Sequence, residues 1–190
     1  MRNIMTRNGK ILSREGLVLT TPRPLFDFVV IGNQRWMNKN LAIDDGQGGI
    51  YTRTVNYGQG DVTEYYYTWD AAVRVANSIQ GWHLPSNDEF GTLASYVGGQ
   101  STAGTKLKST YGWVNDGNGT DDYGFAAFPA GIYYSGAWSD YGKYATFWTA
   151  TEYSSTVSTN REFESDSFKM IQINSSKLWS FSVRLIKDVD

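Results

Sequence analysis

The sequence predicts an α+β fold, and three observations support this. Runs rich in β-branched and aromatic residues, typical of strands, lie near both ends of the chain, at Phe26–Ile31 and Phe181–Ile186. Two segments between Thr68 and Gly99 instead space their apolar residues as an amphipathic helix does. The remainder is dense in glycine, with 20 in the chain, which is typical of long loops. Strands followed by helices, loops and further strands are the order of an α+β domain.

The first predicted helix begins after Thr68, whose hydroxyl can cap the free backbone N–H groups. Asp70 falls in the first turn, where the helix dipole favours negative charge, and Gly81 is expected to stop the helix. The apolar positions share one face. They are Ala71, Ala72, Val75, Ala76 and Ile79.

The second predicted helix begins with a capping box, in which Ser86 and Glu89 satisfy each other's backbone donors. Its apolar stripe ends before Gly98 and Gly99. No helix is expected after Gly99, and the segments Thr120–Ser139 and Tyr153–Ser180 are expected to be loops or strands.

Composition limits the classes of partner. The net charge of −2 offers no basic surface for nucleic acid, and no apolar run is long enough to insert into a membrane. Cysteine is absent, so disulfides are excluded. Met1–Thr21 lacks the apolar core of a secretory signal peptide. Aromatic residues reach 15%, which suits a surface that grips a ligand.

Two regions are expected. Residues 1–24 form a polar arm, interpreted as an oligomerisation or docking segment or, alternatively, as a disordered leader. Residues 25–190 form the main domain, a length that buries a sizeable core.

Several short segments, taken in order, resemble one family. They are Ile31–Met37, Tyr67–Ala72, Gly81–Ser86, Gly104–Ser109, Gly119–Phe125, Phe128–Gly131, Phe147–Glu152 and Phe181–Arg184. Together they resemble the FISUMP-type domain, the Fibrobacter succinogenes major paralogous domain, from about Val30 to Asp188.

This resemblance implies a C-type-lectin-like fold, with two helices packed on small antiparallel sheets and long loops. It also implies surface display or adhesion in bacteria and their phages. Some members are variable proteins of diversity-generating retroelements. By this resemblance, a variable region is expected at about residues 147–184 of this chain. The chain departs from the family ending at Ser180, where glycine is usual, and at Leu185, where cysteine is usual.

Residues 153–180 contain no glycine and no proline but many serines, asparagines and aromatics. This composition is typical of binding loops, where aromatics supply rigid contact area and small polar residues supply adaptable hydrogen bonds. Strand alternation places Ile171 and Ile173 on one face and Met170 and Gln172 on the other. The candidate ligand-binding residues are Tyr153, Thr156, Val157, Asn160, Glu162, Glu164, Asp166, Lys169, Ile171, Ile173, Asn174, Ser176, Leu178 and Trp179. The alternative is an ordinary hairpin whose apolar residues complete the core.

Catalytic and metal chemistry find little support. His83, the one histidine, lies between Trp82 and Leu84 and is interpreted as a buried hydrogen-bonding residue. The acidic stretch Asp116–Asp122 lacks the spacing of a calcium-binding loop and is interpreted as a group of turns. The alternative is that it binds a structural ion. Trp36, Trp69, Trp82, Trp113 and Trp148 are expected in the core, which leaves Trp138 and Trp179 for stacking on a sugar.

The sequence therefore predicts a non-enzymatic, ligand- or receptor-binding, adhesin-like domain that needs no cofactor and no metal. Its expected partner is a cell-surface protein or a glycan, and its expected location is a virion, phage tail, pilus tip or cell surface. A homo-oligomer is expected, with a trimer favoured. The alternatives are a structural virion or surface-assembly subunit that uses the same face for subunit contacts and, ranked lower, an enzyme with an unfamiliar site.

Overall fold

The computed structural model describes residues 5–7, 10–12, 18–19 and 26–187. In the arm, β1 (Met5–Arg7), β2 (Lys10–Leu12) and β3 (Val18–Leu19) pair as one antiparallel sheet. Much of the arm lies outside the described residues. Its expected role in docking or oligomerisation therefore stays a prediction.

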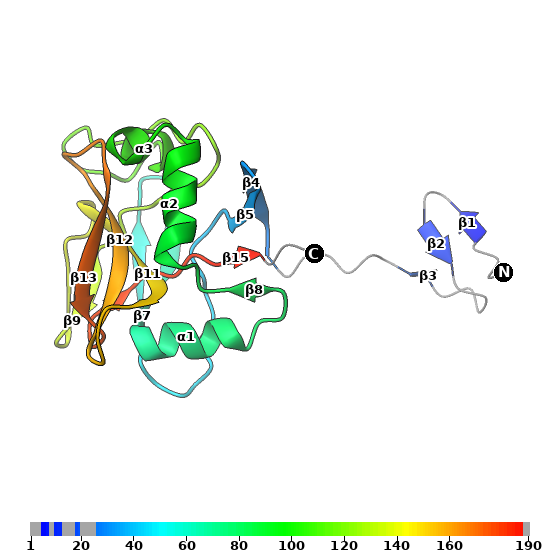
Figure 1. The fold of residues 1–190 in the computed structure, drawn as a ribbon, viewed down its shortest axis with the longest axis horizontal. Coiled ribbons are helices and arrows are strands. Elements are labelled where there is room, and N and C mark those ends of the chain that lie inside the picture. Colours follow the sequence, from blue (N-terminus) through cyan, green and yellow to red (C-terminus); the bar gives the residue numbers. More distant parts are fainter. Residues whose placement is uncertain (1–4, 8–9, 13–17, 20–25, 188–190) are drawn as a thin grey trace.

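Residues 26–187 form an α+β domain with three antiparallel sheets and three helices (Figure 1). The four-stranded sheet runs β4–β5–β15–β8, the five-stranded sheet β10–β9–β14–β7–β6, and the three-stranded sheet β11–β12–β13. The strands are β4 (Phe28–Ile31), β5 (Gln34–Met37), β6 (Ile50–Asn56), β7 (Asp61–Thr68), β8 (Trp82–His83), β9 (Ile132–Tyr134), β10 (Ala137–Ser139), β11 (Tyr144–Glu152), β12 (Val157–Glu164), β13 (Met170–Ser176), β14 (Ser180–Phe181) and β15 (Ile186–Lys187).

The two predicted helices are confirmed, each with its predicted cap. In α1 (Trp69–Asn77), the Thr68 hydroxyl accepts a hydrogen bond from the backbone N–H of Ala71. In α2 (Asn87–Tyr96), Ser86 and Glu89 form both hydrogen bonds of the capping box, at 3.2 and 2.7 Å. The helices bury the faces that their apolar spacing predicted, but α1 ends at Asn77 with Ser78 as its C-cap, before the predicted stop at Gly81, so Ile79 lies outside the helix.

A third helix, α3 (Gln100–Leu107), contradicts the expectation that no helix follows Gly99. Gly99 caps it without a side-chain hydrogen bond, and its sequence contains Gly104 and two threonines, so propensity alone disfavours a helix. Tertiary packing overrides that propensity. A Cβ at Gly104 would lie 2.6 Å from backbone atoms of residues 168 and 169, so glycine lets α3 approach the start of β13.

The last segment of the domain, residues 180–187, joins all three sheets. Its β14 pairs with β7 and β9 in the five-stranded sheet, and its β15 pairs with β5 and β8 in the four-stranded sheet. Between them, Ser182 exchanges backbone hydrogen bonds with Thr146 and Trp148 of β11, at 3.1 and 3.2 Å. This segment therefore fixes how the sheets meet.

Arg184, in the middle of that segment, is fully buried. Its guanidinium donates to the backbone carbonyls of Met37 at 3.0 Å, Phe125, and Ala126 at 3.2 Å, and to the side-chain oxygen of Asn40 at 2.8 Å. A buried cation is stable only when such acceptors surround it.

The buried carboxylate of Glu64 balances this cation through Asn40. The Asn40 amide donates to Glu64 at 2.9 Å, and the Tyr57 hydroxyl donates to its other oxygen at 3.0 Å. Burial raises the pKa of Glu64, whereas these hydrogen bonds and the Arg184 charge lower it. The network crosses from β7 to the C-terminal segment.

Apolar side chains fill two adjoining cores. One lies between α2, α3 and the inner face of β11–β12–β13, and the other between α1, β7 and the C-terminal segment. The five tryptophans predicted to be buried are all less than 9% exposed. None of the helices in the described part of the chain has the length and apolar character needed to cross a membrane.

Trp148 lies in the second of these cores, and its removal tests the framework. It is 0% exposed, packs on Phe181 with ring centroids 4.4 Å apart, and donates from its indole to the Tyr67 carbonyl at 2.8 Å. We expect Trp148→Ala to lower the free energy of unfolding by about 3–5 kcal/mol in urea titrations. Trp138→Ala, at a side chain that is 41% exposed, should cost less than about 1 kcal/mol. Equal costs for both would contradict the buried framework.

Two helical glycines give a matched test of the close approach by α3. Gly104→Ala should destabilise the protein, because its new methyl group meets backbone that cannot move independently. Gly91→Ala in α2 should stabilise it by up to about 1 kcal/mol, since its nearest neighbour lies at 4.0 Å and alanine favours helix. Thermal denaturation of both variants measures the contrast, and a stabilising Gly104→Ala would refute the packing of α3 on β13.

Candidate ligand-binding groove

The sheet β11–β12–β13 has one face in the core and one face turned outward. Ala145, Phe147, Phe163 and Met170 alternate onto the core face and are almost completely buried. Their neighbours along each strand point the other way, because side chains alternate across a strand. The strand register places Thr146, Glu162 and Ile171 in one row across this outer face.

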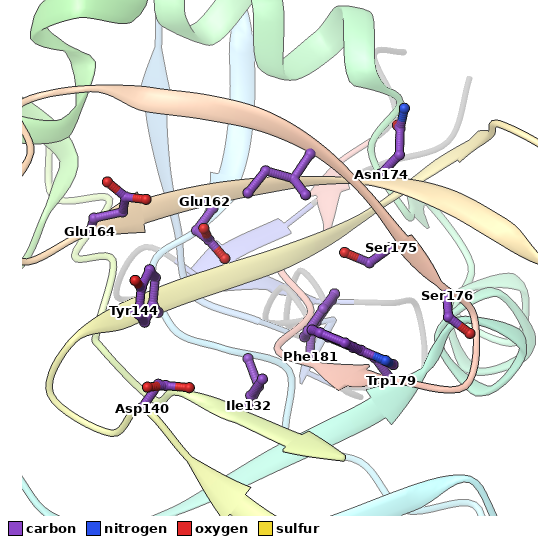
Figure 2. Close-up of a pocket in the computed structure, with 11 residues that line it drawn as sticks. Ile132, Asp140, Tyr144, Glu162, Glu164, Asn174, Ser175, Ser176, Trp179 and Phe181 are labelled. Carbon is purple, nitrogen blue, oxygen red and sulfur yellow. The ribbon is translucent and has the colours of Figure 1, made fainter. Parts of the chain in front are cut away.

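A second wall faces that sheet and closes a groove of about 510 Å³. It comes from the hairpin β9–β10 and from the turn that leads into β14. Figure 2 shows the side chains that line the groove. They are Ile132, Asp140, Tyr144, Glu162, Glu164, Ile173, Asn174, Ser175, Ser176, Trp179 and Phe181.

One end of the groove is acidic. Asp140, Glu162 and Glu164 lie there with the phenol of Tyr144, and no lysine, arginine or histidine lines the groove (Figure 2). Thr146 donates a hydrogen bond to Glu162 at 2.9 Å, and Ser139 donates one to Asp140 at 2.6 Å. Among the described residues, no basic side chain forms an ion pair with these three carboxylates.

Burial and neighbouring charges shift the pKa values of Glu162 and Tyr144. Burial raises the pKa of Glu162 above its ordinary value of 4.5, and the charges of Glu164 and Asp140 raise it further. Burial also raises the pKa of the Tyr144 hydroxyl, followed by the charges of Glu164 and Glu162. A positive charge placed in this end would relieve that repulsion.

The other end is apolar. Trp179 packs against Tyr134 and Phe181, with ring centroids 4.9 and 6.1 Å apart, and Ile132 completes the wall. Lys177 points elsewhere, because its ammonium lies 4.1 Å from the centre of the Trp69 ring and 2.6 Å from a Glu152 oxygen. The groove therefore combines a charged end with an aromatic end.

Asn160 lies under the outer face of the sheet. It pairs in register with Trp148 and Ile173 and shares its strand face with Glu162, so its amide leaves the sheet on the groove side. The side chain is 0% exposed, and neither its nitrogen nor its oxygen has a hydrogen-bond partner among the described residues. A buried amide without hydrogen-bond partners lowers the free energy of unfolding by roughly 1–3 kcal/mol, so Asn160 destabilises the folded protein.

Six of the predicted binding residues line the groove: Glu162, Glu164, Ile173, Asn174, Ser176 and Trp179. Ile171 lies half-buried on the same sheet face. Tyr153 and Leu178, 70% and 79% exposed, lie outside the groove with the exposed Thr156, Asp166 and Lys169 and the half-buried Val157. Asn160 was predicted as a surface contact but is buried. Trp179 is half-buried and partly completes the core, because its ring contacts Phe181.

The sequence interpretation missed the wall formed by Ile132, Asp140 and Tyr144. A signal existed in the pair Ser135-Gly136, which joins β9 to β10 with positive φ at both residues. Such a pair between alternating aromatic residues is typical of a two-residue hairpin turn. It predicts the hairpin, but not which sheet the hairpin faces.

The other polar clusters have structural partners. His83 is half-buried, not buried as predicted, and its Nε2 lies 2.8 Å from a carboxylate oxygen of Glu89, away from the groove. Asp121 accepts a hydrogen bond from the backbone N–H of Ala126, and Asp116 has positive φ in a separate turn. Within the described residues, no three histidine, aspartate or glutamate side chains are arranged to hold a metal ion.

The raised pKa of Glu162 predicts a pH-dependent effect of Glu162→Gln. The folded state holds the proton more tightly than the unfolded chain, so the stabilising contribution of protonated Glu162 is present at low pH and is lost as pH rises through the raised pKa. Glutamine keeps the acceptor for Thr146 and never ionises. We expect equal melting temperatures near pH 4 and a higher melting temperature for the variant at pH 7.

Glu152→Gln is the control, because Glu152 is 55% exposed and pairs with Lys177. This variant should show no gain at pH 7. A difference between Glu162→Gln and the parent that is constant across pH would indicate a packing effect instead of titration.

Comparison of the chain with curated proteins and with solved structures finds no match. One family model does match it, that of the Fibrobacter succinogenes major domain, over residues 29–187. The match covers all the sheets and helices of the main domain and the whole of the groove. The chain therefore belongs to the Fibrobacter succinogenes major domain family.

Proposed function

We propose that this protein is a non-enzymatic ligand-binding domain, and that its ligand occupies the groove between β11–β12–β13 and the hairpin β9–β10. The observation that carries the proposal is the groove itself. Its volume of about 510 Å³ falls within the roughly 300–1,000 Å³ typical of binding sites, and its lining mixes aromatic side chains with carboxylates that form no ion pair with any described basic residue.

The placement of the groove supports a role in recognition. Most of its lining comes from residues 153–180, the segment whose composition is typical of binding loops. The core-facing residues of the same strands are buried, so the groove-facing side chains of β12 and β13, such as Glu162, Glu164 and Ile173, can change with little effect on the core. This separation suits a variable binding face, and we extend the proposal to a diversified, adhesin-like domain on a virion, phage tail, pilus tip or cell surface.

The alternative function is assembly. Tyr153, Phe168 and Leu178 are each at least 70% exposed and lie outside the groove. Exposed apolar side chains often mark protein contacts. A structural subunit would bury such residues, and the groove with them, between copies of the chain.

A groove variant and a surface control separate these functions. We expect ligands selected from glycan arrays and displayed random peptides to lose binding to a double variant with Ile171→Ser and Ile173→Ser. The melting temperature of this variant should fall only slightly, because both side chains are partly exposed.

The control is Val30→Ser, a 62% exposed position on β4, which should bind as the parent does. Ligands that bind the groove variant and the parent equally would refute the proposed site. An oligomer in light scattering that dissociates in the groove variant would favour the assembly function instead.

A further inference from the structure

The acidic end of the groove receives no basic side chain from the described part of the chain. Three carboxylates line it without a basic side chain among the lining residues. Two nearby lysines have other partners. Lys108 donates to the backbone carbonyls of Glu164 and Ser167, each at 3.0 Å, and acts on the Glu164 carboxylate only through its charge, while Lys177 pairs with Glu152.

Asn160 is an independent sign of a ligand on this face. Its amide is fully buried, directed to the groove side of β12 and unpartnered among the described residues. Isolated carboxylates can remain solvated, whereas a buried amide with neither donor nor acceptor satisfied is rare in a native protein. Asn160 does not itself line the groove, and a ligand group that reached its amide from the groove side would complete its hydrogen bonds.

The edge of the groove suits an extended polypeptide. Strand β13 is the outer strand of its sheet, so one side of its backbone has no strand partner among the described residues. Asn174, Ser175 and Ser176, at its end, line the groove. An exposed strand edge offers main-chain hydrogen bonds to an added strand, with side-chain pockets beside it for specificity.

We infer that the groove binds an extended basic segment of a partner polypeptide, which places a lysine or arginine side chain between Asp140, Glu162 and Glu164. An apolar residue next to this side chain packs on Trp179 and Phe181. The inference rests on the proposed binding function of the same groove and specifies its ligand chemistry. Charge-assisted hydrogen bonds to the carboxylates supply the specificity.

The test uses the full chain, immobilised, and a library of random linear peptides displayed on phage. Selected peptides should be enriched in lysine or arginine next to an apolar residue, and their binding should weaken as ionic strength rises. A double variant with Glu162→Gln and Glu164→Gln should bind them at least about tenfold more weakly. The matched control is Asp116→Asn with Asp122→Asn, which removes two charges outside the groove and should leave the affinity unchanged.

Asn160 is tested separately with Asn160→Leu, a change of similar size that removes the unpaired amide. We expect equal or higher thermal stability and weaker binding of the same peptides. Unchanged peptide affinity in this variant would remove Asn160 from the proposed site.

The outcomes distinguish this inference from the proposed function. Peptides with no basic enrichment that still lose binding in the Ile171→Ser, Ile173→Ser variant would overturn the inference and leave the proposed function standing. Selected peptides that no groove variant affects would overturn both. Full competition by N-acetyl-lysine amide would overturn the extended-peptide part, because a single cation would then account for the affinity.

Discussion

The buried guanidinium of Arg184 is the interaction on which the arrangement of the sheets depends. It lies midway along residues 180–187, the segment that enters all three sheets of the domain. Its donors reach the carbonyl at the end of β5, two carbonyls in the loop at residues 125–126, and the side chain of Asn40, which links it to Glu64 on β7. Removing one member of such a network leaves another buried charge without a partner, so its members act together.

This anchoring explains how a groove can lie next to a rigid core. Trp148 and Phe181 pack together, and backbone hydrogen bonds from Ser182 hold β11 beside them. The groove face of the sheet is therefore supported from behind and from one end, where Phe181 both lines the groove and packs on Trp148. Binding surfaces of this kind keep their geometry when the contacting residues change.

The sequence predicted the elements that depend on local rules. The capping box of Ser86 and the apolar face of α1 are readable because their partners lie within four residues. It failed for α3, whose helix depends on backbone contact between Gly104 and residues 168–169. No local pattern encodes a contact between residues so far apart in the sequence.

The same limit explains the mixed result for the candidate site. Alternation placed Ile171 and Ile173 on one strand face, and the structure shows them there. The burial of Asn160 could not be predicted, because the exposure of a strand residue depends on which other segments pack over the strand. Asp140 and Tyr144 were missed because they reach the groove through sheet packing and cross-strand register. The residue types of a segment indicate that it forms a binding surface. The segments that form the opposite wall of the groove are determined by the topology of the sheets.

The groove also carries features that local stability rules disfavour. A half-buried Glu162 beside two other carboxylates and a buried, unpaired Asn160 both raise the free energy of the folded state. Natural proteins keep such features mainly where function requires them, and a well-packed framework tolerates their cost. Both features lie on one face of β12, whereas the opposite face of the same strand carries the core residue Phe163. The two disfavoured features thus coincide with the surface proposed to bind a ligand, which would relieve both of them.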